Sequence, residues 1–336
     1  MVVVMKFIAL DIGKTKSIAM MFDENLDILC SVSSGPADIT LEENIVKTNI
    51  RDAIDTCLRR TTTSIEDVDL IVFSWAGLDT KRDLDIAWNY VRELGYPFEK
   101  IIIEHDAITA FYAVTWGKPG IAVIAGTGAI AFGMNRFGRR ARSSGWGWII
   151  GDEGSASWIA LQALNAVSRA YDGRGRYTSL INRIREFYNV DDLLDIVTYI
   201  YRMKPFDIGK IAAIAVLVDE EAEKGDEVAR EIMEKAGLEL ALSVYSVAQK
   251  LGMVDDDIIV GGIGSVFKSK IVNRVFENRV RKLLRKATLK EPIVGYRAIL
   301  GPIIIALQRL GMDITQDIVE KVLKNVERAE TSILVV

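Results

Sequence analysis

The chain has 336 residues, which is enough for two ordinary domains because single hydrophobic cores usually stop growing near about 250 to 300 residues. Half of the residues are hydrophobic, and 46 acidic against 42 basic residues give a net charge of −4, so we expect a folded globular protein. A nucleic-acid-binding protein would normally carry a basic stripe. The nearest candidate, Arg139, Arg140 and Arg142, is typical of a solvated hairpin end, so we expect no nucleic-acid partner.

The cysteine count and the hydropathy pattern predict a cytoplasmic protein without a membrane partner. Cys30 and Cys57 are too few and too far apart for a zinc or iron–sulfur site, and they form no secreted disulfide framework. The apolar start, MVVVMKFIAL, lacks a basic leader and a cleavage site, and we interpret it as a first strand. No apolar stretch reaches the roughly 18 residues that a membrane span needs.

The first third of the chain predicts an α/β layer. Three apolar runs predict consecutive antiparallel strands, and alternating helices and strands then follow, a pattern typical of α/β domains. The strands are expected at residues 7–10, 16–22, 28–32, 70–75 and 101–104, and the helices at 41–60, 82–94 and 106–116.

The same opening recurs after the turn GKPG at residues 117–120. A buried strand at 121–125, a glycine-rich turn at 126–128 and a second strand at 129–134 repeat the strand–turn–strand unit, which indicates a duplicated α/β domain. Residues 155–251 are expected to be mostly helical, with a charged, exposed segment at 219–226. A strand at 257–260 then runs into GGIGSVF and another helix.

The predicted domains are therefore residues 1–118 and residues 119–311, the second with a helical insertion. We expect the C-terminal helices, residues 312–336, to pack back on the first domain. No low-complexity linker separates the halves, so we expect them to pack across a cleft. Small residues three apart, at Ala107, Ala110 and Ala113 and again at Gly295, Ala298 and Gly301, favour close helix crossings, either at a hinge or in a tightly packed core.

The turn after the first strand has the composition of a phosphate-binding hairpin. Gly13 lets the backbone approach a ligand, Thr15 and Ser17 supply hydroxyls, and free N–H groups can donate to phosphate oxygens. Asp11 supplies one carboxylate for Mg²⁺, which keeps much of its water and needs few protein ligands. An ordinary hairpin with a glycine turn explains this stretch equally well.

Two further glycine-rich turns have the same two interpretations. Gly126, Thr127 and Gly128 can wrap a second phosphate group or form a tight turn. Because the two units stand at the heads of the two halves, a nucleotide held between two domains is the better interpretation. Gly261, Gly262 and Gly264 follow a strand and precede a helix, where the backbone can lie flat against a ligand ring, and Ser265 is a candidate helix cap.

Asp106 is the candidate general base. It lies where a strand ends and a helix begins, so the helix N-terminus stabilises its anion, and it can accept the proton of a hydroxyl in phosphoryl transfer. A plain N-cap explains the position as well. His105, the only histidine, precedes it; adjacent residues do not share a helix face, so we expect no His–Asp dyad and a structural role for His105.

The stretch SSGWGWIIGDEGSA, residues 143–156, is the densest in candidate ligand-binding groups. Its acids can accept hydrogen bonds from hydroxyls, and its aromatic faces can cover an apolar sugar face. Helix capping explains Glu153 and Ser155, whereas Asp152 is better interpreted as a ligand-binding residue.

These motifs, taken in order, resemble the superfamily of acetate and sugar kinases, heat-shock chaperones and actin. More closely they resemble the BadF/BadG/BcrA/BcrD ATPase family and its N-acetylglucosamine kinase and archaeal hexokinase members. The resemblance covers nearly the whole chain, and GWG followed by GDEGS is its most specific part. The matching segments are DIGKTKS at Asp11, GP at Gly35, AGLD at Ala76, HDA at His105, AGTG at Ala125, GWGWIIGDEGSASW at Gly145 and GGIGS at Gly261.

The resemblance implies two actin-like, ribonuclease H-like ATPase domains around a nucleotide cleft, with ATP and Mg²⁺ as cofactors. It implies Asp106 as catalytic base, Asp11 as the Mg²⁺ ligand through water, and a homodimer. The implied ATP-binding residues are Asp11, Gly13, Lys14, Thr15, Lys16, Gly126, Thr127, Gly128, Gly261, Gly262, Gly264 and Ser265. The implied sugar-binding residues are Asp38, Gly77, Asp106, Gly145, Trp146 and Asp152.

Three departures from the family pattern bear on the identity of the sugar. Asp38 stands where these sugar kinases often have the asparagine of GPxN, Ala129 replaces the usual serine after GTG, and Ile130 removes a polar position that N-acetylglucosamine kinases can offer the sugar. The phosphotransfer groups are retained.

We therefore expect an ATP-dependent sugar kinase that phosphorylates a hydroxyl of a hexose or amino sugar of the N-acetylglucosamine, glucosamine or glucose type. Two alternatives stay open. An ATPase that activates a radical dehydratase would need cysteines for an iron–sulfur cluster between subunits, and Cys30 and Cys57 are not a convincing pair. A sugar-sensing regulator would need a DNA-reading module, and the chain starts directly with its first strand.

Overall fold

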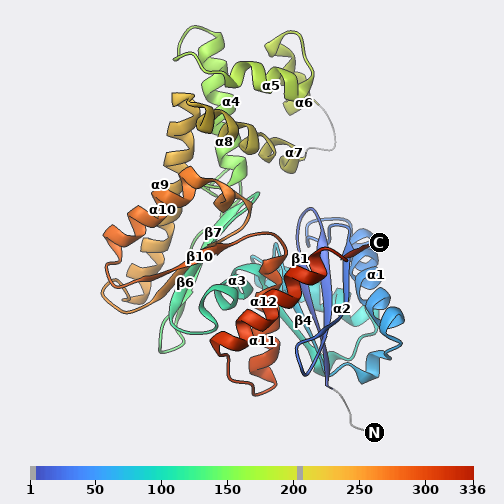
Figure 1. Ribbon diagram of the computed structural model, residues 1–336. Helices are drawn as coiled ribbons and strands as arrows, with labels where there is room; N and C mark the ends of the chain where they lie inside the picture. Colours follow the sequence, from blue (N-terminus) through green and yellow to red (C-terminus); the bar gives the residue numbers. More distant parts are fainter. Residues whose placement is uncertain (1–4, 203–206) are drawn as a thin grey trace. The chain divides into compact units, whose positions relative to one another are not determined.

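The computed structural model describes residues 5–202 and 207–336, and residues 1–4 of the predicted first strand lie outside the described residues. The chain divides into two compact units, residues 1–117 with 295–336 and residues 118–294. Figure 1 labels the helices and some of the strands. The first unit contains β1 Lys6–Ile12, β2 Ser17–Asp23, β3 Ile28–Ser34, α1 Glu43–Thr61, β4 Leu70–Trp75, α2 Lys81–Leu94, β5 Ile101–His105, α3 Asp106–Thr115, α11 Leu300–Arg309, α12 Gln316–Glu330 and β11 Leu334–Val335.

The second unit begins with the repeated strand–turn–strand opening and continues with a helical region. Its elements are β6 Gly120–Ala125, β7 Ala129–Met134, β8 Arg140–Ser144, α4 Ala156–Tyr171, α5 Leu180–Tyr188, α6 Ile196–Tyr201, α7 Ile208–Ala212, α8 Ile214–Lys224, α9 Glu227–Leu251, β9 Ile259–Ile263, α10 Lys270–Leu283 and β10 Thr288–Ile293.

The sheet of the first unit has the strand order β11-β3-β2-β1-β4-β5. The strands β1, β2 and β3 form the antiparallel meander that the apolar runs predict, whereas β4 and β5 run parallel to β1. Parallel pairing needs a crossover, and α1 and α2 supply these connections. In Figure 1 these two helices cover one face of the sheet, while α3 and α11 pack together on the other.

The sheet of the second unit repeats this topology. Its order is β10-β9-β6-β7-β8, in which β6, β7 and β8 form an antiparallel meander and β9 and β10 extend the sheet in parallel from β6. Omitting β11, both sheets have the same order and the same strand directions. The predicted duplication is therefore confirmed at the level of topology.

Each unit has its own apolar core. In the first unit α1 and α2 cover buried side chains of β1, β4 and β5, among them Leu10, Phe73 and Trp75. In the second unit α9 lies across β6, β7 and β8, and α4 and α8 stack on α9. The fold thus agrees with the α/β class that the sequence predicts.

Helix ends follow local signals in the sequence. Thr80 and Asp83 form a capping box at the start of α2, and Gly95 ends this helix in the left-handed conformation, at φ +80°. Ser155 accepts a hydrogen bond from the backbone nitrogen of Trp158 at 3.1 Å and begins α4, so its predicted capping role is confirmed.

The division of the chain differs from the second domain boundary expected from the sequence. Residues 295–311, which we assigned to the second domain, belong to the first unit, because α11 packs on α3, β4 and β1. An apolar helical pattern does not reveal which of two similar sheets the helix covers. The C-terminal segment does pack on the first unit, where α12 contacts β3 and β11 pairs in parallel with Val32 and Ser33.

The charged segment at 219–226 is less exposed than predicted. It forms most of α8, and Glu221 is only 6% exposed. The carboxylate of Glu221 pairs with Lys224 at 2.8 Å and with Arg183 at 3.4 Å, and it also accepts from the hydroxyl of Ser179. The prediction failed because the sequence does not distinguish a buried carboxylate that has basic partners from a carboxylate exposed to solvent.

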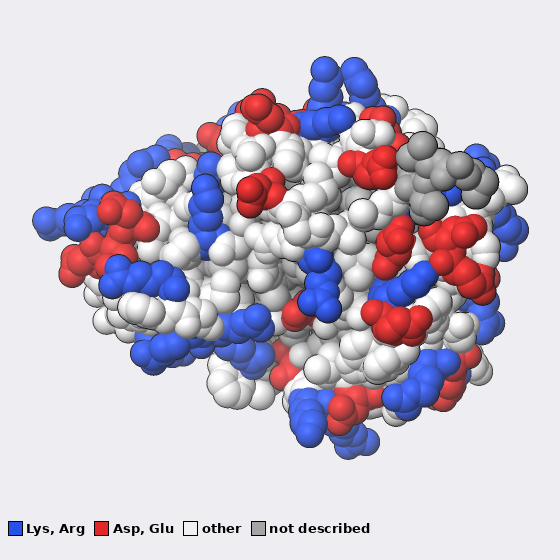
Figure 2. All heavy atoms as spheres, turned by 90° about the horizontal axis from the view of Figure 1, so that it is seen from below, with Lys and Arg blue, Asp and Glu red and all other residues white. Residues whose placement is uncertain are grey.

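Charge is mixed on the face of the molecule shown in Figure 2, where acidic side chains interrupt the basic ones. Arg139 and Arg140 lie at the exposed end of the hairpin of β7 and β8, as predicted. Among the described residues, no helix is both long enough and apolar enough to span a membrane.

Helices α3 and α11 lie closest to each other at Gly301. We therefore expect a larger side chain at this position to lower the stability of the protein. A Cβ atom at position 301 would lie 2.2 Å from the carbonyl oxygen of Thr109, which is backbone and cannot rotate away. Gly301→Ala gains up to about 1 kcal/mol of helix propensity, but we expect the clash to dominate and to lower the free energy of unfolding by about 1–3 kcal/mol.

Urea unfolding measures this change. Lys321→Ala, on the exposed side of α12, is the control and is expected to change the free energy of unfolding by less than about 0.5 kcal/mol. Equal stability of Gly301→Ala and the parent would show that the helices do not approach this closely.

Candidate active site

Parallel pairing of three strands places the acids of the first unit at one edge of the sheet. Asp11 of β1 pairs with Ser74 of β4, and Ser74 pairs with Glu104 of β5. In the next row Trp75 pairs with His105, so Asp106 follows directly beyond the carboxyl end of β5. The site therefore lies where parallel strands end, the usual place for ligands in α/β sheets.

A hydroxyl pair links Asp11 to the start of α3. The hydroxyl of Ser74 lies 3.3 Å from Oδ1 of Asp11 and 2.6 Å from the hydroxyl of Thr109. Thr109 in turn donates to the backbone carbonyl of Asp106 at 2.9 Å. Each hydroxyl has one proton, so only two of these three contacts are hydrogen bonds at one time while Asp11 is ionised, and together they place Asp11 close to the first turn of α3. Sequence reasoning missed both hydroxyls, although Ser74 is a polar residue in an otherwise apolar strand and so carried a signal.

Asp11 has an unusual protonation equilibrium. Burial raises the pKa of its carboxyl, the negative charge of Asp106 raises it further, and the Ser74 hydrogen bond and the Lys16 charge lower it, so that it rises from 3.8 to about 6. Its second oxygen, Oδ2, accepts no hydrogen bond from the residues that the structure describes. Asp11 therefore favours a cation or a proton beside it.

The first turn has the backbone geometry of an anion site. The nitrogen of Gly13 donates to the carbonyl of Lys16 at 3.0 Å, and the carbonyl of Gly13 accepts from Ala37 at 3.3 Å. The N–H groups of Lys14 and Thr15 donate to no acceptor among the described residues. The ammonium of Lys16 lies 3.9 Å from the ring centroid of Tyr296. Exposed N–H groups beside a lysine can receive phosphate oxygens.

Asp106 and His105 form a contact that the sequence analysis excluded, so that expectation was wrong. Asp106 is the first residue of α3, and the N-cap is His105, with extended backbone at φ −61° and ψ 141°. The rule that adjacent residues do not share a helix face applies only within a helix. His105 precedes the helix, so the rule does not apply to it. Its Nδ1 lies 2.8 Å from Oδ1 of Asp106, and its Nε2 lies 3.6 Å from a carboxylate oxygen of Asp79.

Asp38 and Gly77 come together in the first unit, as the resemblance implies. Asp38 is 1% exposed, and its Oδ1 accepts from the backbone nitrogen of Thr40 at 2.9 Å and from the Thr40 hydroxyl. Its Oδ2 has no hydrogen-bond partner among the residues that the structure describes, and a Cβ at Gly77 would lie 3.0 Å from that oxygen. A buried acceptor without a donor is costly, so this oxygen is suited to a ligand hydroxyl or amine.

The second turn, in the other unit, is held by its carbonyl groups. The carbonyl of Gly126 accepts from the nitrogen of Ala156 at 2.8 Å, and that of Thr127 accepts from the nitrogen and the hydroxyl of Ser157 at 3.3 and 2.6 Å. The N–H groups of Thr127 and Gly128 donate to no acceptor among the described residues. Anchored carbonyls and open N–H groups again make an anion cradle.

The GWG and GDEGS segments lie against this turn. Oδ1 of Asp152 accepts from the nitrogen of Gly147 at 3.1 Å, and a Cβ at Gly128 would lie 2.7 Å from Oδ2 of Asp152. Asp152 has a φ of +58°, a strained conformation for a residue other than glycine that is often found at functional sites. Trp146 is 65% exposed, and the guanidinium carbon of Arg142 lies 5.8 Å from its ring centroid. Gly145 packs against the side chain of Ile130.

The third glycine-rich segment differs in part from the prediction. Gly261 and Gly262 lie inside β9, and a Cβ at Gly262 would lie 2.4 Å from the Phe267 ring, so this close approach is to the protein itself. Gly264 has a φ of +115° and lies against the carbonyl of Ala125, which precedes the second turn.

Ser265 does not cap a helix through its side chain. It begins a short 3₁₀ turn, and Ser269 caps α10 by accepting from the nitrogen of Val272 at 3.3 Å. The capping prediction for Ser265 was therefore wrong, because the chain makes this extra turn before α10 begins.

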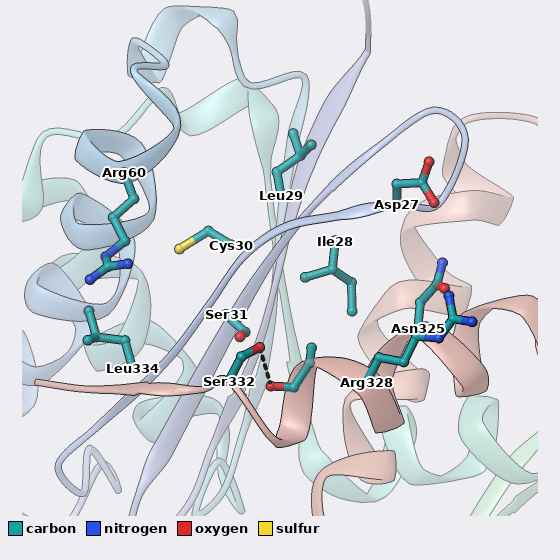
Figure 3. Close-up of a pocket in the computed structure, with 11 residues that line it drawn as sticks. Asp27, Ile28, Leu29, Cys30, Ser31, Arg60, Asn325, Arg328, Ser332 and Leu334 are labelled. Atoms are coloured by element: carbon teal, nitrogen blue, oxygen red, sulfur yellow. Dashed lines mark hydrogen bonds between the residues drawn. The ribbon is translucent and has the colours of Figure 1, made fainter.

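A separate cavity of about 490 Å³ lies at the outer edge of β3 (Figure 3). It forms because β11 covers β3 only at Val32 and Ser33, so that residues 27–31 face α12 across an open space. No residue that we assign to ATP or sugar lines it. Cys30, on its wall, and Cys57 are both buried, whereas a cluster shared between subunits needs cysteines at a surface.

Comparison with known proteins gives the relatives of this chain. The model of the BadF/BadG/BcrA/BcrD ATPase family matches residues 8–306. The N-acetylmuramic acid/N-acetylglucosamine kinase of Clostridium acetobutylicum is 34% identical over 304 residues, which cover 89% of this chain and 97% of that protein. The N-acetyl-D-glucosamine kinase of Dictyostelium discoideum is 32% identical over 256 residues, with coverages of 74% and 80%.

A solved structure has the same fold. The provisionally assigned N-acetylglucosamine kinase of Porphyromonas gingivalis superposes with a TM-score of 0.71 at 17% identity, covering 92% of this chain and all of that one. The α/β fold expected from the sequence is thus shared with a solved structure.

Proposed function

Because the chain belongs to the BadF/BadG/BcrA/BcrD ATPase family, we propose that it is an ATP-dependent sugar kinase that phosphorylates a hydroxyl of a hexose or amino sugar. Two curated relatives that are each more than 30% identical are named as kinases of N-acetylated sugars, which supports this substrate class. The reaction is phosphoryl transfer to an alcohol, and it needs an acceptor for the hydroxyl proton and donors for the phosphate oxygens.

The observation that carries the proposal is the connection between Asp106 and the first turn. Asp11, Ser74, Thr109 and the backbone of Asp106 lie in one row of close polar contacts, so a carboxylate suited to a base lies near the strand that leads into a backbone turn suited to phosphate. Phosphoryl transfer depends mainly on such positioning.

In the proposed mechanism Asp106 accepts the proton of the sugar hydroxyl while that oxygen attacks the γ-phosphorus and the bond to the β–γ bridging oxygen breaks. The turns at Gly13–Lys16 and at Gly126–Gly128 donate N–H groups to the phosphates, and Lys14 and Lys16 add positive charge. Gly261, Gly262, Gly264 and Ser265 are assigned to the adenosine side, which is supported by the contact of Gly264 with Ala125 beside the second turn.

Asp11 fits a magnesium ion held through water. Its Oδ2 lacks a donor among the described residues, and burial together with the negative charge of Asp106 raises its pKa, so a further cation beside it would stabilise the carboxylate. Mg²⁺, when bound, neutralises charge on the phosphate oxygens of ATP. Asp11 would hold this ion by accepting hydrogen bonds from its water ligands.

The sugar is assigned to Asp38, Gly77, Asp106, Gly145, Trp146 and Asp152. Oδ2 of the buried Asp38 has no hydrogen-bond partner among the described residues, which supports a hydrogen bond between Asp38 and the sugar. The exposed ring of Trp146 supports a stacking role against the sugar. We further propose a cytoplasmic homodimer, as the resemblance implies.

A screen for sugar-dependent ADP release tests the proposal. Glucose, glucosamine, N-acetylglucosamine, mannosamine and nucleosides are offered with Mg²⁺ and ATP, and we expect turnover with at least one hexose or amino sugar. Rapid ATP hydrolysis that no sugar stimulates would overturn the proposal, and stoichiometric iron in the protein would instead favour a dehydratase activator.

Asp152→Asn gives a specific prediction for the sugar. Asparagine can still accept from Gly147 through its side-chain oxygen, but it loses the charge that strengthens hydrogen bonds from sugar hydroxyls. Because charge-assisted hydrogen bonds are worth about 1.5–3 kcal/mol, we expect the KM for sugar to rise roughly 10- to 100-fold. Steady-state kinetics should show the KM for ATP within about twofold of the parent.

Asp255→Asn is the matched control, since Asp255 is an exposed acid of the same unit. Its kinetic constants are expected to equal those of the parent. An unchanged sugar KM in Asp152→Asn would remove Asp152 from the sugar site.

A further inference from the structure

His105 lies beside Asp106 and contacts its carboxylate. It is the last residue of β5 and the N-cap of α3, so its ring lies over the first turn of the helix that Asp106 begins. The ring is mostly buried, with 16% of its side chain exposed. Carboxylates lie near both of its nitrogens, with Asp106 2.8 Å from Nδ1 and Asp79 3.6 Å from Nε2.

One nitrogen of this ring has two possible partners that exclude each other. The nitrogen of Ala107 lies 2.9 Å from Nδ1 and can donate to it only when Nδ1 carries no proton. Oδ1 of Asp106 can accept from Nδ1 only when Nδ1 carries a proton. The neutral ring with bare Nδ1 therefore caps α3, whereas the imidazolium holds Asp106.

The surroundings favour the imidazolium. Burial alone lowers the pKa of His105, but the hydrogen bonds and negative charges of Asp106 and Asp79 outweigh burial and raise it to about 10. At neutral pH the ring is then positively charged, and Nδ1–H donates to Oδ1 of Asp106. Oδ2 of Asp106 is left for another donor.

We propose that His105 is a positioning residue: its imidazolium, flanked by Asp79, holds Oδ1 of Asp106 and thereby fixes the carboxylate whose other oxygen takes the proton of the acceptor hydroxyl. The inference rests on the proposed function for its catalytic consequence. The contact itself does not depend on that function.

The backbone and the side chain of Asp106 are thus held independently. Thr109 holds its carbonyl, and His105 holds one carboxylate oxygen. A carboxylate held at one oxygen has lost most of its rotation, and a base must lie within hydrogen-bond reach of its proton in the correct orientation. Without His105 the helix would still place the Asp106 backbone, but the carboxylate would turn freely.

The first experiment measures the contact without any assay of turnover. His105 is the only histidine in the chain, so the imidazole signals in an NMR pH titration belong to it alone. We expect a pKa well above the ordinary 6.5 in the parent, and a fall of at least one pH unit, a tenfold change in proton affinity, in Asp106→Asn. An ordinary pKa in the parent that Asp106→Asn leaves unchanged would overturn the proposal, whatever the protein phosphorylates.

The second experiment distinguishes the effect of losing the N-cap of α3 from the effect of losing the positive charge of His105. His105→Asn keeps a good N-cap but has no cation, and His105→Ala loses both. With the sugar identified by the screen, we expect His105→Asn to lower kcat about tenfold or more while the KM for ATP stays within about twofold and the unfolding temperature stays near that of the parent. Added imidazole should partly restore kcat in His105→Ala.

Asp85→Asn, an exposed acid of α2, is the control for charge removal in the same unit and should behave as the parent. A kcat of His105→Asn within twofold of the parent would overturn the positioning role. Failure of the parent to turn over any sugar would instead contradict the proposed function, and the NMR titration would still decide whether His105 holds Asp106.

Discussion

Asp106→Asn is expected to retain ATP binding and to lose most of kcat, by about 10²- to 10⁴-fold, because asparagine keeps the shape of the side chain but cannot accept the hydroxyl proton. The hydrogen bond from Thr109 goes to the backbone carbonyl of residue 106, so the substitution leaves it in place. Nucleotide affinity, measured by calorimetry, should therefore stay close to that of the parent.

The Asp85→Asn variant again serves as the matched control, since it removes one negative charge from an exposed site of the same unit. If the kcat of Asp106→Asn with the best sugar stays within a few-fold of the parent, Asp106 is not the base. A loss of ATP binding with unchanged kcat would place Asp106 in the nucleotide site instead.

Asp11→Asn is expected to make the protein more stable and less active at once. The folded state raises the pKa of Asp11 from 3.8 to about 6, so folding favours the protonated carboxyl. Between these two pH values the folded state binds more protons than the unfolded state, and stability therefore falls as pH rises. Above both values the ionised carboxylate costs the folded state roughly 3 kcal/mol, and asparagine avoids that cost.

Urea unfolding without nucleotide at two pH values measures this effect. At pH 8 Asp11→Asn should exceed the parent in unfolding free energy by up to about 3 kcal/mol, and near pH 4 the two should be nearly equal. Turnover with Mg²⁺ and ATP should fall at least about tenfold, since the carboxylate that would hold the hydrated ion is gone. Equal stability of both proteins at pH 8 would show that Asp11 carries no such cost.

Much of the fold could be predicted because its strands are short apolar runs separated by glycine-rich turns. The hydrophobic runs at 7–10, 70–75 and 121–125 all lie in strands of the structure. The strand–turn–strand pattern that recurs after residue 117 matches the repeated strand order of the two sheets. The edge strands β8 and β10 were missed. The first carries arginines and serines, and the second contains Pro292, which an edge strand tolerates but which weakens the sequence signal.

The geometry of the candidate site could be predicted only in part. Glycines indicated the first two turns, and the structure places Asp11 near the end of β1 and Asp106 directly after β5. The contact of His105 with Asp106 depends on the N-cap geometry of a residue just outside a helix, which adjacency in the sequence does not reveal. Likewise, Gly262 accommodates the Phe267 ring, a neighbour that only the folded chain brings close.

Helix α4 joins the two elements of the second unit to which we assign binding roles. Its first residues hold the carbonyls of Gly126 and Thr127, and the loop that carries Asp152 leads straight into it. If the loop binds sugar and the turn binds phosphate, as we propose, a shift of the loop on sugar binding is expected to move the turn, and a shift of the turn on ATP binding is expected to move the loop. Such coupling is reciprocal by thermodynamic necessity, so each substrate should tighten or loosen the grip on the other by one common factor.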